Sequence, residues 1–199
     1  DLDRSPAAAM EIAGEGLSVV LAARMLAGNE TGRAVFISPE GDEGVAASVM
    51  VAREASDAGQ RVVFLDLTRS GAATLAMLED ASLPGMTDLL SAEAQFSDVI
   101  HADLYSECHV IPAGTADVGR AMRAIDRLPI ILTSLETAYD LVVVECGSAD
   151  AAGVGRVADP EATVLIGVID PADPAIAEAP ADRAANGFTN VVKVSPLRP

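Results

Sequence analysis

Three short apolar segments of this sequence are each followed by residues that can do chemistry. Segment 35–37 leads into a turn that contains Gly41 and Gly44, and segments 62–65 and 141–144 are followed by Asp66 and Glu145. An apolar strand, a glycine-containing turn and a helix form the context in which a phosphate-binding loop lies. A carboxylate at a strand end is the kind of group that holds Mg²⁺ beside such a loop. The spacing therefore indicates the frame of a nucleotide site.

The turn itself has the wrong residues for nucleotide binding. A phosphate-binding loop uses a Lys to reach the β- and γ-phosphates and a Ser or Thr to hold Mg²⁺, but the three positions after Gly44 are Val45, Ala46 and Ala47. The acidic pair of the turn places negative charge where phosphates would lie, and like charges at such distances repel by about 1 kcal/mol even in water. We interpret the set as a vestigial nucleotide site made of Gly41, Asp42, Glu43, Gly44, Val45, Ala46, Ala47, Asp66 and Glu145.

Each of these acidic groups has a second interpretation. Asp66 is either a surviving magnesium or base-like carboxylate or a relic hydrogen-bonded to nearby backbone, and Glu145 either holds Mg²⁺ through a water or is a solvated or locally paired carboxylate. Asp42 and Glu43 form either a solvated acidic turn or a surface that meets a basic partner.

No metal site and no redox site is predicted elsewhere. His101 and His109 have no third ligand at metal-binding spacing, so we expect ordinary surface or packed histidines. Cys108 and Cys146 lack a CxxC spacing, so we expect buried free thiols in a reducing compartment.

Composition limits the class of protein. With 199 residues, of which 50% are hydrophobic, the chain can bury a full core and is expected to be a single domain, 1–199. The formal charge of −17 argues against nucleic acid or an anionic lipid surface as a ligand. The apolar runs are far shorter than the ~20 residues that span a bilayer. Because the chain begins at Asp1 without a Met, we expect it to be a piece of a longer protein.

The elements that must position these residues alternate between strands and helices. A helical N-terminal segment, 1–28, begins with Ser5 as N-cap, and an α/β core occupies 33–195. Strands are predicted at 35–37, 61–66, 108–111, 141–145, 162–168 and 190–194. Their apolar residues do not alternate with polar ones, which is typical of parallel strands covered on both faces. We therefore expect an α/β fold of three layers with a mostly parallel sheet and ligands at the carboxyl ends of its strands.

Several phrases of the sequence resemble the bacterial tyrosine kinases (BY-kinases) of capsule and exopolysaccharide export, relatives of other P-loop NTPases. Segment 83–91, LPGMTDLLS, is similar to their GLTDLLSG phrase, segment 110–114 to LPAG, and segment 139–145, YDLVVVE, to YDxVIID. The phrases lie in the family's order between about 15 and 194. The resemblance implies a P-loop NTPase-like fold in which the turn after Ile37, Asp66 and Glu145 occupy the Walker A, A′ and B positions.

The departures from that family fall on the chemistry. Its PGEGKST becomes GDEGVAA at 41–47, its DADLR becomes DLTRS at 66–70, and its Walker B Asp becomes Glu145. Its oligomerisation motif ExxRxxR would fall at Glu15, Ser18 and Leu21, without either arginine, and its C-terminal tyrosine cluster is missing. We therefore expect a protein-tyrosine kinase or ATPase fold that is inactive, with no cofactor and with ATP and Mg²⁺ not bound.

The function predicted is that of a pseudokinase-like cytoplasmic domain of an exopolysaccharide or capsule biosynthesis and export protein, acting through protein contacts. Its expected partners are other components of that complex; membrane contact is expected only through missing parts of an inner-membrane parent chain. The isolated domain is expected to be a monomer or weak dimer. Two alternatives stay open: a kinase or ATPase with a non-standard P-loop, and a divergent Min/Par partitioning ATPase, for which residues 38–40 lack the signature Lys.

Overall fold

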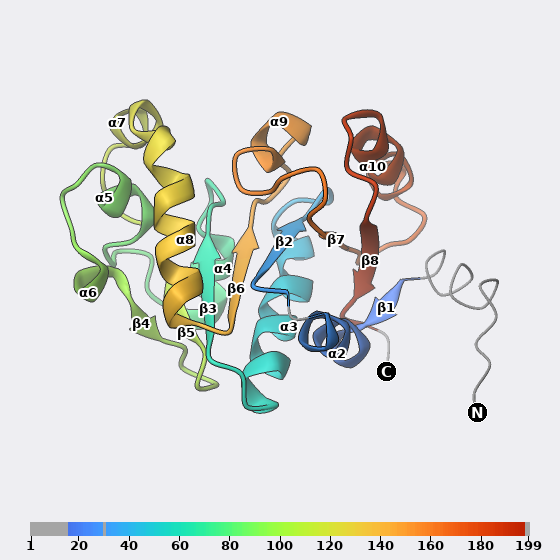
Figure 1. Ribbon diagram of the computed structural model, residues 1–199, viewed down its shortest axis with the longest axis horizontal. Coiled ribbons are helices and arrows are strands. Elements are labelled where there is room, and N and C mark those ends of the chain that lie inside the picture. Colours follow the sequence, from blue (N-terminus) through green and yellow to red (C-terminus); the bar gives the residue numbers. More distant parts are fainter. Residues whose placement is uncertain (1–15, 30, 198–199) are drawn as a thin grey trace.

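One continuous eight-stranded sheet organises the computed structural model, which describes residues 16–29 and 31–197 (Figure 1). Its strand order is β1-β8-β7-β2-β6-β3-β5-β4. The strands are β1 (Leu17–Ser18), β2 (Arg33–Ile37), β3 (Val62–Asp66), β4 (His101–Ala102), β5 (His109–Ile111), β6 (Leu141–Glu145), β7 (Val164–Gly167) and β8 (Val191–Ser195). All pairings are parallel except that of β4 with β5.

Helices cover both faces of this sheet. They are α2 (Val19–Gly28), α3 (Ala46–Asp57), α4 (Ala72–Leu78), α5 (Met86–Leu90), α6 (Phe96–Val99), α7 (Val118–Arg123), α8 (Leu128–Ala138), α9 (Ala151–Val154) and α10 (Pro174–Ala185), with 3-10 turns η1 (Asp42–Val45) and η2 (Ile125–Arg127). In Figure 1, α3 and α4 lie behind the sheet and α8 lies in front of it. The predicted three-layer α/β fold with a mostly parallel sheet is confirmed.

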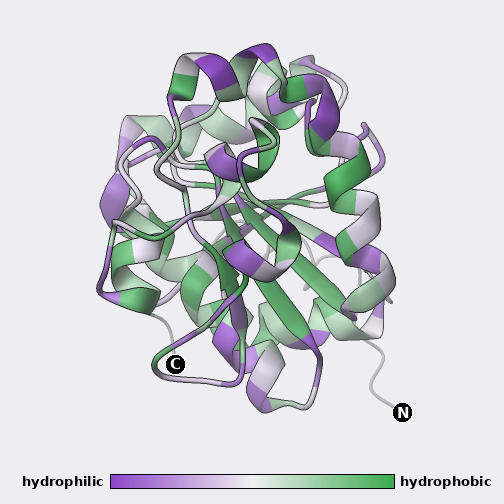
Figure 2. Cartoon of the chain, turned by 90° about the vertical axis from the view of Figure 1, so that its left-hand side faces the viewer, coloured by the Kyte–Doolittle hydropathy of each residue, from purple (hydrophilic) through white to green (hydrophobic). Residues whose placement is uncertain are grey.

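Two hydrophobic cores follow from this layering. Every residue of β3 and β6 is buried, and successive residues of each strand point to opposite faces. Val63 and Leu65 belong to the core under α5, α7, α8 and α10, whereas Val62 and Phe64 belong to the core under α2, α3 and α4. Figure 2 shows the hydrophobic strands enclosed by helices that carry hydrophilic residues. The non-alternating strands of the sequence are thus explained by burial on both faces.

The N-terminal segment differs from the expectation of a helical 1–28. Leu17 and Ser18 form a short strand beside β8, after Gly16 with a φ of 86°. Helix α2 begins only at Val19, and the Ser18 hydroxyl accepts a hydrogen bond from the Leu21 amide. Helix was the wrong prediction for residues 17 and 18, which are extended; Gly16 before them has a positive φ, which lies outside the right-handed helical region. The N-cap predicted at Ser5 lies outside the described residues.

The second helical stretch agrees with its sequence signals. Asp117 accepts a hydrogen bond from the Arg120 amide as N-cap of α7, and Pro129 lies in the first turn of α8. Asp is a favoured N-cap residue and Pro is tolerated in the first turn of a helix, so the division of this stretch into α7 and α8 follows from its sequence. Among the described residues, we find no helix with the length and apolar character needed to cross a membrane.

Strand register places the polar residues of interest at one edge. Asp66 is the direct neighbour of Glu145 between β3 and β6, and Phe36 is the neighbour of Glu145 between β2 and β6. The turn after Ile37 therefore begins beside Glu145, and Asp66 lies one strand further along the same edge. This is the carboxyl-terminal edge of the parallel strands, where α/β sheets place their ligand sites.

Candidate functional site

The turn after β2 is closed on itself. The Gly41 amide donates to the Ser38 carbonyl (3.0 Å), and the Gly44 amide donates to the Gly41 carbonyl (3.0 Å). The Ala46 amide donates back into η1 as well. A phosphate-binding loop must instead point consecutive amides at its ligand. The described turn has the position of such a loop, but three of its amides are already bonded within it.

The residues after Gly44 face the core rather than a ligand. Val45 is 5% exposed and Ala47 is fully buried, and both pack in the core under α2, α3 and α4. The only lysine of the sequence, Lys193, lies in β8, beyond β7 from β2. No lysine of this chain therefore replaces the missing cation from another position of the turn.

Acidic side chains hold the turn in place. Both Glu40 carboxylate oxygens accept hydrogen bonds from consecutive backbone amides after β7, those of Ile169 (2.7 Å) and Asp170 (2.8 Å). Asp42 accepts a hydrogen bond from the Ser70 hydroxyl (2.7 Å) in the loop after β3. Sequence reasoning missed the role of Glu40, because its partners lie about 130 residues away and only the fold brings them near.

Glu145 is fully buried and surrounded by protein donors. Its Oε1 lies 2.9 Å from the Ser38 hydroxyl and 2.8 Å from the Gly147 amide, and its Oε2 lies 2.5 Å from the Ser48 hydroxyl. Burial raises the pKa of Glu145 to about 7, against the lowering effect of these hydrogen bonds, and the nearby charge of Asp66 raises it further. Each oxygen that would serve Mg²⁺, directly or through a water, already has a protein partner.

The Ser48 hydroxyl explains how a protonated Glu145 fits. Ser48 Oγ lies within hydrogen-bond distance of both Glu145 Oε2 (2.5 Å) and the Val45 carbonyl (3.0 Å), but a hydroxyl has one proton. If Glu145 is protonated, it donates to Ser48 and Ser48 donates to Val45, so that both contacts are satisfied. Ser38 and Ser48 were not among the predicted site residues. Ser48 lies one position beyond the hydroxyl positions of a P-loop, so motif alignment passed over it.

Asp66 is fully buried and receives four hydrogen bonds. Its Oδ1 accepts from the amide and hydroxyl of Thr68 (2.9 and 2.6 Å), and its Oδ2 accepts from the amide and hydroxyl of Thr74 (2.7 Å each). Asp66 thus fastens the end of β3 to the first turn of α4. The geometry is that of a structural carboxylate bonded to nearby backbone.

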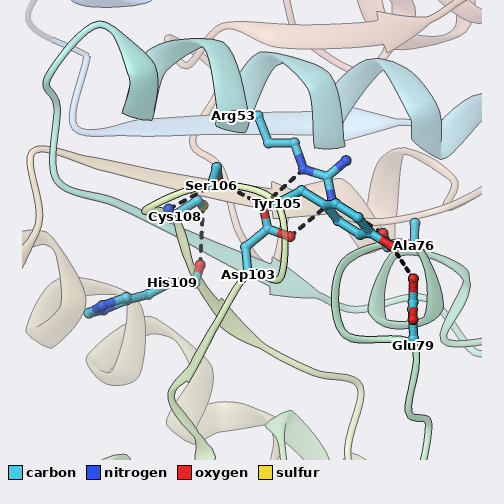
Figure 3. A network of polar contacts seen from close by, with 8 residues as sticks. All are labelled: Arg53, Ala76, Glu79, Asp103, Tyr105, Ser106, Cys108 and His109. Carbon is cyan, nitrogen blue, oxygen red and sulfur yellow. Dashed lines mark hydrogen bonds and ion pairs between the residues drawn. The ribbon is translucent and has the colours of Figure 1, made fainter.

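A second polar cluster lies away from the strand ends, around Arg53 of α3 (Figure 3). Its guanidinium makes two hydrogen bonds to Asp103 (2.9 Å each), whose side chain has no exposed area. The Tyr105 ring packs on the same guanidinium at 4.9 Å, and its hydroxyl donates to Glu79. The hydrogen bond to Asp103 raises the pKa of Arg53 further above its ordinary value. The cluster fixes loop 103–108 to α3 and α4, which is a structural role.

The two candidate histidines have protein partners, and the two cysteines are free thiols. His101 Nε2 lies 3.2 Å from the Pro84 carbonyl oxygen, and His109 Nδ1 lies 2.7 Å from the Tyr139 hydroxyl. Cys108 is buried and Cys146 is half-buried; both are free, and burial raises the pKa of Cys108 to about 12. No group of three or more His, Cys, Asp or Glu within residues 16–29 and 31–197 is arranged to hold a metal ion.

A cleft of about 620 Å³ opens at the same sheet edge, and we call it the strand-end cleft. The loops after β2, β3, β5 and β6 contribute Gly41, Thr68, Gly114 and Gly147, and helices α5, α7 and α8 form its far wall. Asp88 of α5 connects two of the loops beside this cleft, because its carboxylate accepts hydrogen bonds from the amides of Gly85 and Thr115 (2.8 Å each). The two segments that resemble tyrosine-kinase sequences, 83–91 and 110–114, also contact each other directly, because the Met86 and Thr87 amides donate to the Pro112 and Ala113 carbonyls.

Solved structures share this fold. The BceF tyrosine kinase domain is 23% identical, with a TM-score of 0.66 over 89% of this chain and 73% of its own. The kinase domain of Escherichia coli tyrosine kinase ETK is 20% identical, with a TM-score of 0.69 over 88% and 74%. The Pyrococcus furiosus cell division ATPase MinD is 20% identical, with a TM-score of 0.59 over 82% and 71%.

No family model matches the sequence, and no curated protein matches it. At these identities the likeness to solved structures establishes the fold. It confirms the tyrosine-kinase and P-loop ATPase fold that the sequence phrases implied.

Proposed function

We propose that this chain is a pseudokinase-like domain of a polysaccharide synthesis and export protein, which does not use nucleotide and acts through protein contacts. One observation carries the first part: the turn that would bind phosphates is bonded internally and anchored by Glu145. The sequence phrases of export-associated tyrosine kinases, together with the shared kinase-domain fold, support the second part.

Loss of the phosphate contacts is expected to remove nucleotide affinity. A hydrogen bond to a charged group contributes about 1.5–3 kcal/mol, so the missing lysine alone costs at least about tenfold in affinity. The absent hydroxyls at Ala46 and Ala47 and the acidic Asp42 and Glu43 weaken binding further. The same losses remove the cationic stabilisation on which phosphoryl transfer depends.

Calorimetric titration with ATP and ADP, each with Mg²⁺, tests this proposal. We expect no saturable heat for this chain and saturable binding by the E. coli ETK kinase domain titrated in parallel. A micromolar dissociation constant for this chain would instead support the alternative, a kinase or ATPase with a non-standard loop. Transfer of labelled phosphate to Tyr105 or Tyr139 above a heat-denatured control would support the same alternative.

A genetic experiment tests the protein-contact role. Deletion of this domain from its parent protein is expected to lower the amount of surface polysaccharide. Asp42→Asn, which changes the vestigial turn but no buried group, is expected to leave that amount unchanged. Unchanged polysaccharide after deletion would refute the proposed role.

A further inference from the structure

The strand-end cleft has the size of a small-molecule site. At about 620 Å³ it lies within the range of roughly 300–1,000 Å³ that is usual for ligand pockets. The turn after β2 lines only one side of it, through Gly41 and Asp42. Most of the cleft is therefore formed by residues that the vestigial phosphate loop does not supply.

The far wall of the cleft is apolar. Leu90 of α5, Ala121 of α7 and Leu128 at the start of α8 are buried at its base. Val118 and Met122, both on α7, are 57% and 43% exposed at its opening. Large apolar side chains that remain exposed beside a cavity provide favourable surface for the apolar body of a ligand.

Two arginines without protein partners line the same cleft. Arg69 lies in the loop after β3 and Arg156 follows α9, and both are exposed. No ion pair or hydrogen bond within residues 16–29 and 31–197 occupies either guanidinium, whereas Arg33, Arg53, Arg61, Arg120 and Arg183 each have a carboxylate partner. In a chain with a formal charge of −17, these two guanidiniums bring positive charge to one cavity.

The acidic groups of the cleft do not neutralise these arginines by direct contact. Asp66 is buried beneath four hydrogen-bond donors, and Asp42 is bonded to the Ser70 hydroxyl. A guanidinium presents a planar set of donors that matches phosphate or carboxylate. The charged side of the cleft is therefore suited to an anionic group, and the opposite wall to an apolar one.

We propose that the strand-end cleft binds an amphipathic organic anion, with an anionic head held by Arg69 and Arg156 and an apolar body against α5, α7 and α8. The head contacts arginine side chains, so binding needs neither Mg²⁺ nor the amides of the turn after β2. This inference goes beyond the proposed function and does not depend on it.

Calorimetry of the full chain with hexyl phosphate, inorganic phosphate and hexanol, without Mg²⁺, tests the pairing of head and body. We expect one saturable site for hexyl phosphate and at least about tenfold weaker binding of each half-ligand, as expected when one charged hydrogen-bonding contact is lost. If inorganic phosphate bound as tightly as hexyl phosphate, the proposed contact between the apolar body of the ligand and the helices would be overturned. No saturable binding of hexyl phosphate would overturn the proposal.

Matched variants locate the site. Arg69→Gln and Arg156→Gln are each expected to weaken hexyl phosphate binding about tenfold. Arg24→Gln makes the same charge change at an exposed position of α2 and is expected to leave binding unchanged. Met122→Gln is expected to weaken hexyl phosphate binding. Ile130→Gln changes an exposed residue of α8 outside the cleft and is expected to have no effect on binding. An effect of Arg24→Gln equal to that of Arg156→Gln would overturn the site. Binding of Mg-ATP that is unaffected by Arg156→Gln would contradict the proposed function while leaving this inference intact.

Discussion

At the scale of single residues, the carboxylates that suggested a magnesium site are buried and bonded to the protein. Asp66 fastens β3 to α4, and Glu145 fastens the turn after β2 through Ser38 and Ser48. The extra methylene of Glu145, compared with the Asp that resembling sequences carry, coincides with contacts to both serines. These two carboxylates therefore stabilise the fold at positions where the resembling kinases would bind a metal ion.

Glu145 makes the stability of the chain depend on pH. Its pKa is raised to about 7 in the folded chain, above its ordinary value of 4.5. The folded state therefore keeps a proton that the unfolded state loses, and stability falls as pH rises from about 4.5 to about 7, by about 3 kcal/mol, and then stays level.

Urea unfolding of the chain and of Glu145→Gln measures this contribution. Gln keeps an acceptor for Ser38 and Gly147 and a donor for Ser48, so it imitates the protonated carboxyl. The variant is expected to lack this fall in the free energy of unfolding and to be more stable than the parent chain at about pH 8. The same pH dependence in both proteins would contradict the assignment.

Val45 shows why restoring one motif residue does not restore a P-loop. Its side chain is 5% exposed in the core under α3, so a lysine there would bury an ammonium group. Val45→Lys is expected to lower the free energy of unfolding by about 3 kcal/mol and to confer no ATP binding, whereas Val45→Met retains stability within about 1.5 kcal/mol. Denaturant unfolding measures the stability of the two variants, and titration with ATP measures their binding. A Val45→Lys protein that is as stable as the parent chain and binds ATP would contradict this prediction.

At the scale of elements, the central strands and the α7–α8 division were predictable because burial and helix caps leave local signals. Strand β1 and the antiparallel β4 were missed, since two-residue edge strands are defined by their neighbours rather than by their own sequence. The turn after β2 follows the strand predicted at 35–37, but the contacts that anchor this turn to the rest of the fold were not predictable. Those anchoring contacts involve Glu40, Ser48 and Gly167, which meet segments distant in the sequence.

The close packing of β7 against η1 can be tested by adding one methyl group at Gly167. A Cβ on Gly167 would lie 2.5 Å from the Gly44 carbonyl oxygen and 3.2 Å from Ala47 Cβ. Gly167→Ala is expected to destabilise the chain by about 2 kcal/mol, because backbone of the turn must shift.

Gly28→Ala is the matched control, since a Cβ at this helical position meets nothing within 4 Å. It is expected to be neutral or stabilising by up to about 1 kcal/mol. Thermal or denaturant unfolding of the two variants decides the matter, and equal stability would show that β7 does not confine the turn.

At the scale of the whole molecule, charge opposes self-association. The formal charge is −17, and like-charged copies repel over about 8–10 Å at physiological salt. The family's arginine positions are Ser18, which caps α2, and Leu21, which is 45% exposed. Neither residue supplies the cation that the resembling kinases use to join subunits.

We therefore predict a monomer or at most a weak dimer for this chain. Static light scattering at moderate salt measures the mass directly. If repulsion keeps the copies apart, association should increase with ionic strength, because salt screens surface charge. A stable ring-sized particle at low salt would contradict the prediction.

The most direct test of the central claim follows the backbone amides of the turn itself. We predict that the NMR resonances of the Gly41, Gly44 and Ala46 amides stay unchanged when ATP and Mg²⁺ are added at millimolar concentration, because these amides are already hydrogen-bonded within the turn. Saturable, Mg²⁺-dependent shifts of these three amides would show that the turn opens to bind phosphate, and would contradict a domain that works without nucleotide.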